Sequence, residues 1–243
     1  MPLHAGSILT ADCPLARIGG RYPPPRDFGA WSFCQFDNNS EIFSVGIGND
    51  ATFDWSVARH YGSRVSSFDP TITRSAFDHL MVDPKVGAKP TPLTEEERSL
   101  IRFFPFGLAT VNDVLPFWRS PTYGAMASIH EYPGKTRPPS LMAPVMTLPM
   151  LMALAGVHRV DILKVDIEGA EVGLFSDPVA RAWLCDWRAP PQIGLEFHTT
   201  NATVSNIELD ALRRCGYVLR LEEKQTNTFL MVRTSARNVA HGE

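Results

Sequence analysis

Short apolar runs typical of strands alternate with amphipathic stretches typical of helices from Glu41 to the end of the chain. The predicted strands are 42–45, 64–68, 101–108, 160–166, 192–198, 217–222 and 228–232. The predicted helices are 52–60, 72–80, 148–154, 170–175 with a continuation to 185, and 207–215. Strands joined through helices run parallel, because each helix returns the chain to the same edge of the sheet. We therefore predict an α/β fold of the Rossmann-like type, with a mostly parallel sheet and a C-terminal antiparallel hairpin.

The length of 243 residues fits one domain with a short extension. Residues 1–40 are rich in Pro, Gly and Arg but carry several aromatic side chains, so we expect an arm that ends in a strand at 30–36 and packs on the domain. Residues 41–243 form the domain itself. Within it, residues 109–146 mix polar turns with short candidate strands near 125–130 and 143–146, and we expect a lid-like insertion there.

Charge and hydropathy exclude several kinds of partner. The net charge is -3 and no long Lys/Arg run occurs, so no nucleic-acid partner is expected. The longest apolar run, 141–157, is interrupted by Pro144 and Pro149, so no membrane span is expected. The first residues lack the apolar core of a signal peptide, and the expected location is the cytoplasm.

The cysteines show no metal-binding pattern. Cys13, Cys34, Cys185 and Cys215 form no C-x-x-C pair, which argues against a zinc site. In a cytoplasmic protein we expect buried, reduced thiols. A bridge between Cys13 and Cys34 is the alternative if the chain enters an oxidising compartment.

A glycine-rich turn follows the predicted strand 42–45. Gly46-Ile-Gly-Asn-Asp50 precedes a helix, so the backbone there turns tightly and offers free N–H groups to a ligand. Asp69 ends the next strand, where an acid commonly binds ribose hydroxyls. Because ligands of open α/β sheets bind at the carboxyl ends of the strands, these residues predict a nucleotide site.

Two nucleotide cofactors fit this turn. Gly46 to Ala51 formally satisfies the dinucleotide pattern G-x-G-x-x-G/A, so an NAD(P)-dependent oxidoreductase is an alternative. Asp50 would repel a pyrophosphate, whereas S-adenosylmethionine (SAM) has no phosphate and carries an ammonium group that an acid attracts. The chain also lacks a Tyr-x-x-x-Lys pair, which is common in reductases. The residues therefore favour SAM.

Titrating side chains gather where two of the predicted strands end. Side chains alternate between the two faces of a strand. One side of strand 160–166 and its extension therefore carries Lys164, Asp166 and Glu168. One side of the next strand carries Glu196 and His198. If these strands are neighbours, the catalytic candidates lie beside the cofactor: Asp166, Glu168, Glu196 and His198. His198 is the preferred general base because of its intrinsic pKa, and Asp166 is the second choice.

The same group of side chains allows other interpretations. Its oxygens and imidazole would accept Mg²⁺, although no metal site is expected. Lys164, in an apolar strand, is expected to pair with a neighbouring carboxylate. Glu171 is expected to serve the dipole of the helix that follows, and a core position is the alternative for His198.

The segment Leu163-Lys-Val-Asp-Ile-Glu-Gly-Ala-Glu171 resembles the signature L-K-[IV]-D-[IV]-E-G-x-E of the FkbM-type SAM-dependent methyltransferases. Thr147-Leu148, Phe106-Gly-Leu108 and Phe68-Asp-Pro70 also fit. Arg17-Ile-Gly-Gly20, followed by Asp27-x-Gly-x-Trp-x-x-Cys34, resembles a eukaryotic methyltransferase-like branch of that family.

This resemblance implies a seven-stranded class I methyltransferase fold and a SAM-dependent methyltransferase. It implies O-methylation of a sugar or another small molecule as the reaction, with no metal assigned. An NAD(P)-dependent oxidoreductase and a non-catalytic SAM-fold interaction protein remain the alternatives, and a homodimer is left open. The expected cofactor-binding residues are Gly46, Ile47, Gly48, Asn49, Asp50, Asp69, Pro70 and Leu108.

Overall fold

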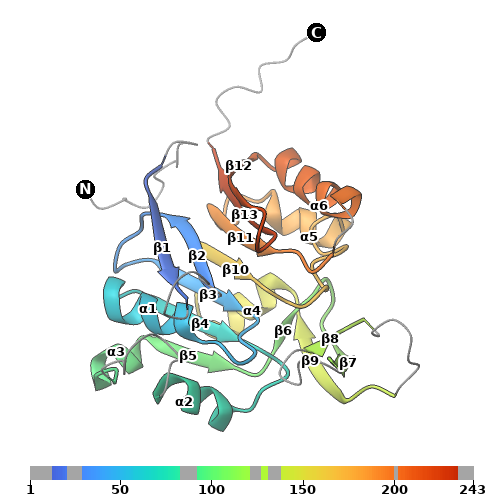
Figure 1. Ribbon diagram of the computed structural model, residues 1–243. Helices are drawn as coiled ribbons and strands as arrows, with labels where there is room; N and C mark the ends of the chain where they lie inside the picture. Colours follow the sequence, from blue (N-terminus) through green and yellow to red (C-terminus); the bar gives the residue numbers. More distant parts are fainter. Residues whose placement is uncertain are drawn as a thin grey trace.

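A seven-stranded sheet forms the centre of the computed structural model, which describes residues 13–20, 29–82, 92–120, 127–130, 138–199 and 202–234 (Figure 1). From edge to edge its strands are β12 (Tyr217–Glu223), β13 (Thr228–Arg233), β11 (Gln192–Glu196), β10 (Ile162–Val165), β3 (Glu41–Val45), β4 (Arg64–Phe68) and β5 (Ile101–Phe104). The strands from β11 to β5 pair in parallel, and β13 runs antiparallel to both of its neighbours. This mixed sheet confirms the predicted α/β class.

The order of the strands places a switch point in the middle of the sheet. The chain enters at β3 and moves outward through β4 to β5, and it then returns to the other side of β3 to form β10 and β11. Connections that diverge from two neighbouring strands leave a crevice at their carboxyl ends, which is where ligands of open α/β sheets bind. The crevice expected here lies between the ends of β3 and β10.

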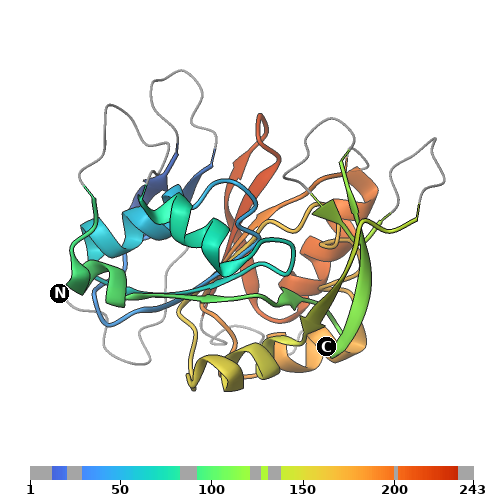
Figure 2. The same cartoon turned by 90° about the horizontal axis from the view of Figure 1, so that it is seen from below.

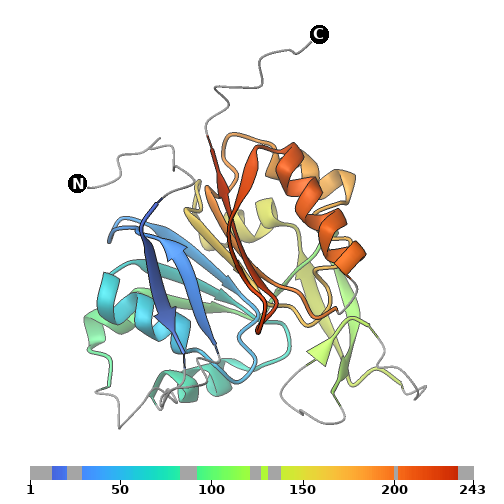
Figure 3. The same cartoon turned by 45° about the horizontal axis from the view of Figure 1, so that its top comes forward.

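Different elements cover the two faces of the sheet (Figures 2 and 3). On one face the core includes apolar side chains of α4 (Leu148–Ala155), α5 (Pro178–Leu184) and α6 (Ala202–Arg214). The other face is covered by α1 (Thr52–Tyr61) and by a hairpin of β1 (Leu15–Gly19) and β2 (Ala30–Cys34). The short helices α2 (Arg74–Val82) and α3 (Glu95–Ser99) adjoin the β5 edge. No helix within the described residues is long and apolar enough to cross a membrane.

The described part of the arm, residues 13–20 and 29–40, packs on the back of the central strands. The ring of Phe33 lies so close to Gly194 in β11 that a Cβ atom there would come within 2.6 Å of it. The backbone N–H of Cys34 donates to the side-chain oxygen of Gln192 at 2.7 Å. The strand predicted at 30–36 is confirmed at Ala30–Cys34, while Asp27 and Phe28 of the arm pattern lie outside the described residues.

All four cysteines are paired, so the expectation of reduced thiols is wrong. Cys13 pairs with Cys34 across the hairpin, and Cys185 at the end of α5 pairs with Cys215 just after α6. The Cα–Cα distances are 5.5 Å and 4.5 Å, within the range that a disulfide spans. The Cys13–Cys34 bridge is the alternative that the sequence left open. The Cys185–Cys215 bridge depends on how α5 and α6 are brought together, which the spacing of cysteines along the chain does not show.

The insertion forms a small sheet of its own, to one side of the central sheet (Figure 1). Its strands, in order, are β6 (Gly107–Leu108), β9 (Leu141–Met146), β7 (Asp113–Arg119) and β8 (Ala127–Ser128). The strand predicted at 101–108 is therefore divided between two sheets, because Pro105 has no N–H to donate and the chain turns there, with the N–H of Phe106 bonded to the oxygen of Phe104. The strand expected near 125–130 is confirmed at β8, with residues 125 and 126 outside the described residues, and the strand near 143–146 is confirmed at β9. Strand β7 was not predicted.

The helix predicted at 170–175 is absent. Residues 169–176 form turns, and α5 begins only at Pro178, with the side chain of Asp177 as its N-cap. Gly173 has a positive φ of 85°, and the N–H groups of Gly173, Phe175 and Ser176 donate to the carboxylate of Glu208 on α6 at 2.7–2.9 Å. This contact with a distant acid replaces the hydrogen bonds that a helix would have made.

Candidate functional site

A cavity of about 820 Å³ opens at the carboxyl ends of β3, β4, β10 and β11, beside the small sheet. Every site residue predicted from the sequence lines this one cavity. The lining includes the cofactor candidates Gly46, Ile47, Gly48, Asn49, Asp50, Asp69, Pro70 and Leu108 and the catalytic candidates Asp166, Glu168, Glu196 and His198. The structure thus brings the two groups of residues together, while the role of each residue stays a prediction.

The glycine turn after β3 touches the end of β10 directly. Gly46 has a φ of 81°, and a Cβ atom on it would overlap the backbone oxygen of Asp166. The contact arises because β3 and β10 are hydrogen-bonded neighbours whose last residues, Val45 and Val165, face each other in register. Only glycine fits this position, for its backbone conformation and for its lack of a side chain.

The carboxylate of Asp69 holds the glycine turn in place through hydrogen bonds to its backbone. Its side chain is 4% exposed, and one oxygen accepts the N–H groups of Ile47 and Gly48 at 2.9 Å and 2.8 Å. The other oxygen accepts the N–H and the hydroxyl of Thr71, both at 2.7 Å. A carboxylate has about four acceptor positions, and all four are used here. Asp69 therefore fixes the shape of the loop. A ribose hydroxyl bound to Asp69, as predicted, would donate to an oxygen that already accepts two other hydrogen bonds.

A second turn, after β10, is held by Glu171. This fully buried carboxylate accepts the N–H of Ile167 at 3.0 Å and that of Gly169 at 2.8 Å. The turn places Glu168 at a positive φ of 54°, which is uncommon for a residue other than glycine and is found at sites where function demands it. The expectation that Glu171 serves a helix dipole is wrong, because no helix starts there.

Glu171 also orients the imidazole of His198. Its oxygen lies 3.0 Å from Nδ1 of His198, so this nitrogen carries the hydrogen and Nε2 points into the cavity. Sequence reasoning missed this function of Glu171. The only signal was that another acidic side chain follows the glycine in the same motif as Asp166 and Glu168.

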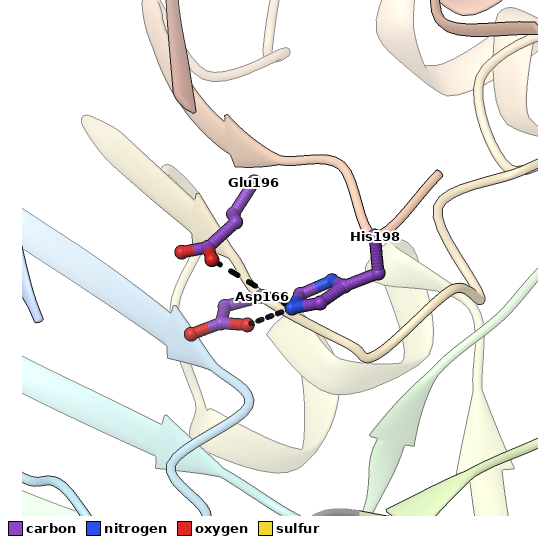
Figure 4. A group of neighbouring side chains, drawn as sticks. All are labelled: Asp166, Glu196 and His198. Carbon is purple, nitrogen blue, oxygen red and sulfur yellow. Dashed lines mark ion pairs between the residues drawn. The ribbon is translucent and has the colours of Figure 1, made fainter. Parts of the chain in front are cut away.

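Three carboxylates surround Nε2 of His198. The Nε2 atom lies 3.6 Å from Asp166, 3.7 Å from Glu196 and 3.7 Å from Glu168. Figure 4 shows Asp166 and Glu196 directed toward this nitrogen from the ends of two neighbouring strands. These separations are longer than a hydrogen bond, so the imidazole and the carboxylates form ion pairs without hydrogen bonds between them.

The crowding of acids changes the protonation of the cluster. Burial alone would lower the pKa of His198, but the hydrogen bond to Glu171 and the charges of Glu171, Asp166 and Glu168 outweigh it and raise the pKa to about 9. Burial, with the neighbouring charge of Asp166, raises the pKa of Glu196 to about 7. Burial also raises the pKa of Glu168. With this pKa, the imidazole is protonated near neutral pH and has no lone pair for a substrate proton.

Lys164 lies beneath the cluster and balances part of its charge. Its ammonium donates to the backbone oxygen of Gly46 at 2.5 Å, lies 3.6 Å from Asp166, and sits over the ring of Trp31 in the arm. The predicted pairing with a carboxylate is confirmed. Deeper still, the buried side chain of Asp54 accepts hydrogen bonds from two serines, and burial raises its pKa to about 6.

Part of the cavity lining is apolar. These apolar side chains come from the strands of the small sheet and the segments next to them: Val111, Leu115, Phe117, Ile129 and Val145. The cavity therefore presents acids and an imidazole from the ends of β10 and β11, and hydrocarbon side chains from the small sheet. Such a division suits a ligand with a polar reacting end and an apolar body.

Three of the cluster residues also meet the spatial requirement for a metal site. Asp166, Glu196 and His198 each offer one ligand atom, and these atoms lie within 4.8 Å of one another. The set consists of two carboxylate oxygens and one imidazole nitrogen, which are donors for several divalent cations.

Comparison with known proteins supports the predicted family. Residues 106–219 match the family described as "Methyltransferase FkbM domain", which confirms the family predicted from the sequence. Among solved structures, the chain is similar to a point mutant of the 16S rRNA (adenine(1408)-N(1))-methyltransferase from Catenulisporales acidiphilia. The two are 15% identical over 82% of this chain and 87% of that chain, with a TM-score of 0.37. No protein of curated function matches the chain.

Proposed function

We propose that this chain, which carries an FkbM methyltransferase domain at residues 106–219, transfers the methyl group of SAM to a hydroxyl oxygen of a small molecule. The observation that carries the proposal is the contact between Gly46 and Asp166 at one cavity. It places the turn suited to a cofactor directly against the group of acids suited to an acceptor.

The cofactor turn lies outside the matched family segment, so its assignment rests on geometry. SAM would lie over Gly46 to Asp50, with Pro70 and Leu108 beside its adenine, because these residues line the cavity on the β3–β4 side. Asp50, which lines the cavity, suits a ligand with an ammonium and no phosphate. The seven-stranded sheet with one antiparallel strand fits the class I fold that the family resemblance implies.

The reaction needs an aligned acceptor oxygen and a place for its proton. The acceptor oxygen attacks the methyl carbon, an O–C bond forms, the C–S bond breaks, and S-adenosylhomocysteine leaves as a neutral thioether. The hydroxyl proton passes to a carboxylate of the cluster, Asp166 or Glu196. Within the described part of the chain, neither side chain accepts a hydrogen bond from another protein group, so their oxygens are available to a hydroxyl.

The walls of the cavity indicate what kind of acceptor fits. A net charge of -3 and the carboxylates at the site argue against a nucleic-acid acceptor. The hydrocarbon wall that includes Leu115 and Phe117 would bury the body of a small molecule while its hydroxyl faces Asp166. We infer a small acceptor that combines an apolar part with at least one hydroxyl group.

Calorimetric titration of the purified chain with S-adenosylhomocysteine tests the cofactor, with NADH titrated in parallel. We expect saturable binding of S-adenosylhomocysteine and none of NADH. NADH binding without S-adenosylhomocysteine binding would favour the oxidoreductase alternative. Activity is then measured as methyl transfer from labelled SAM to a library of apolar alcohols and glycosides. Asp166→Asn is expected to lower the rate of methyl transfer at least tenfold. The control Glu95→Gln, an exposed change on α3, is expected to leave the rate unchanged.

A further inference from the structure

We propose that Asp166, Glu196 and His198 bind a divalent metal ion at the cavity. The three residues come from the ends of β10 and β11, which are hydrogen-bonded neighbours, and Figure 4 shows their polar atoms converging on one point. The set contains an imidazole nitrogen besides the carboxylates, and mixed nitrogen–oxygen sets of this kind hold Mn²⁺, Fe²⁺ or Zn²⁺ in proteins.

The spacing of the ligand atoms fits a metal better than it fits direct contact. The distances from Nε2 of His198 are 3.6 Å to Asp166 and 3.7 Å to Glu196, and all three ligand atoms lie within 4.8 Å of one another. In an octahedral site with bonds of about 2.1 Å, adjacent ligands are about 3.0 Å apart and opposite ligands about 4.2 Å apart. The two distances from Nε2 fall within this range and are too long for hydrogen bonds. In the protein alone the groups form only ion pairs, and a metal ion would replace these with direct bonds.

The imidazole is prepared as a ligand by the residue behind it. Glu171 is fully buried and lies 3.0 Å from Nδ1, which fixes the ring and directs Nε2 toward Asp166 and Glu196. A carboxylate that accepts a hydrogen bond from the far nitrogen of a metal-binding histidine is a recurrent support in metal sites. Coordination through Nε2 displaces any proton from that nitrogen to solvent.

The site is open on the side where a substrate would bind. All three residues line the large cavity, so three protein ligands would leave coordination positions that face it. Glu168, whose oxygen is 3.7 Å from Nε2, could supply one further ligand from the same turn. The remaining positions would hold water or an acceptor oxygen.

The role of the ion rests on the proposed function, although its binding does not. An acceptor hydroxyl coordinated to the metal would lose its proton more easily and would be held in line with the methyl group. A pair of neighbouring hydroxyls would occupy two open positions at once. The inference therefore narrows the acceptor class to molecules that chelate a metal through oxygen, such as vicinal diols or hydroxy acids.

Mn²⁺ is the probe that tests the site, because its binding is visible without turnover. The full chain is treated with a chelator, desalted and titrated with Mn²⁺ by calorimetry and by electron paramagnetic resonance. We expect one Mn²⁺ per chain and, in pulsed experiments on the wild-type protein, a coupling to one ¹⁴N nucleus from His198. Adventitious carboxylate binding would lack that coupling, so this readout does not depend on any variant folding.

Variants then locate the ion. His198→Gln and Glu196→Gln are expected to weaken Mn²⁺ binding at least tenfold, Glu171→Gln roughly tenfold through the imidazole, and Glu95→Gln, which removes an equal charge on α3, not at all. Absence of Mn²⁺, Zn²⁺ and Mg²⁺ binding at millimolar concentration would overturn the inference. Binding without ¹⁴N coupling, or binding that His198→Gln leaves intact, would overturn it as well.

A parallel titration with S-adenosylhomocysteine in the presence of chelator separates the two proposals. S-adenosylhomocysteine binding with no metal binding overturns the metal site and leaves the methyltransferase standing. Metal binding with no S-adenosylhomocysteine binding supports the site and overturns the proposed function.

Discussion

The two turns that meet at the cavity differ in how far their polar groups are satisfied by the protein itself. In the turn after β3, Asp69 accepts four hydrogen bonds and leaves no acceptor position over. In the cluster after β10 and β11, Asp166, Glu196 and His198 face one another at 3.6–3.7 Å without a hydrogen bond among them. The first turn is complete without a ligand. The second gathers carboxylates whose negative charge Lys164 and the imidazole of His198 offset only in part.

The difference assigns separate tasks to the two turns. A loop whose carboxylate is fully used is rigid and offers a fixed shape, which suits the recognition of a constant cofactor. A cluster of partly buried carboxylates whose charge is not fully offset lowers the free energy of unfolding, and proteins keep such groups where chemistry requires them. Substitutions in the two regions should therefore have opposite effects on the free energy of unfolding.

Gly46→Ala should have the largest effect, since it breaks the contact between the two turns. The added Cβ would overlap the backbone oxygen of Asp166. We expect a loss of about 4 kcal/mol in the free energy of unfolding and loss of S-adenosylhomocysteine binding. Urea denaturation and calorimetry measure both. Gly156→Ala is the matched control, because Gly156 also has a positive φ, 70°, but nothing lies within 4 Å of its added Cβ, so it should cost only about 1 kcal/mol.

Asp54, beneath both turns, should make the stability depend on pH. Its pKa rises on folding from 3.8 to about 6, so the folded state holds a proton that the unfolded state releases. The wild-type free energy of unfolding therefore loses up to about 3 kcal/mol from this group as pH rises from 4 to 7. Asp54→Asn, which keeps the size of the side chain, should become more stable than wild type by up to that amount across the same interval. Parallel denaturation curves for the two proteins at every pH would contradict this assignment.

Asp69→Asn should weaken the complete turn. The amide oxygen replaces one carboxylate oxygen, but the amide nitrogen cannot accept, so two N–H or O–H donors lose their partner. We expect a loss of about 2 kcal/mol in the free energy of unfolding and weaker binding of S-adenosylhomocysteine. An unchanged stability would mean that the loop does not depend on this carboxylate.

Glu196→Gln should have the smallest effect on the free energy of unfolding, and it should raise this free energy where Asp69→Asn lowers it. It removes one of the like charges around His198 and relieves the burial of a carboxylate. In protein freed of metal we expect a gain of about 0.5–1 kcal/mol in the free energy of unfolding, together with loss of methyl transfer. Destabilisation by this variant would show that the cluster is complete as it stands, and the contrast between the two turns would fail.

The regular parts of the fold could be predicted because their signals are local. The helix at 52–61 carries Phe53 and Val57 one turn apart and ends at Gly62 in the left-handed conformation, and each of these features is readable in sequence. The strands at 42–45 and 64–68 are short apolar runs between turn residues. The alternation of strands and helices also implies that the central strands are parallel neighbours. The residues at their carboxyl ends then lie close together, so the location of the candidate site could be predicted as well.

The remaining features depend on contacts between residues far apart in the chain. The turns at 169–176 replace a helix because Glu208 accepts three of their N–H groups from another element. Strand β7 contains Pro116 and pairs with β9 in a separate small sheet, which interrupts the alternation that identifies strands elsewhere. The role of Glu171 could not be found either, since its two partners are the turn it holds and a histidine 27 residues away.

The hairpin near the start of the chain has a consequence for the reacting groups. Phe33 is pressed against Gly194 and Trp31 lies over Lys164, each two positions before a carboxylate of the cluster, Glu196 and Asp166. The strands that hold the acids are therefore braced from behind by a segment that precedes the sheet in sequence. Deletion of the hairpin would remove these packing contacts. The acids would then lose their alignment although none of them had been altered.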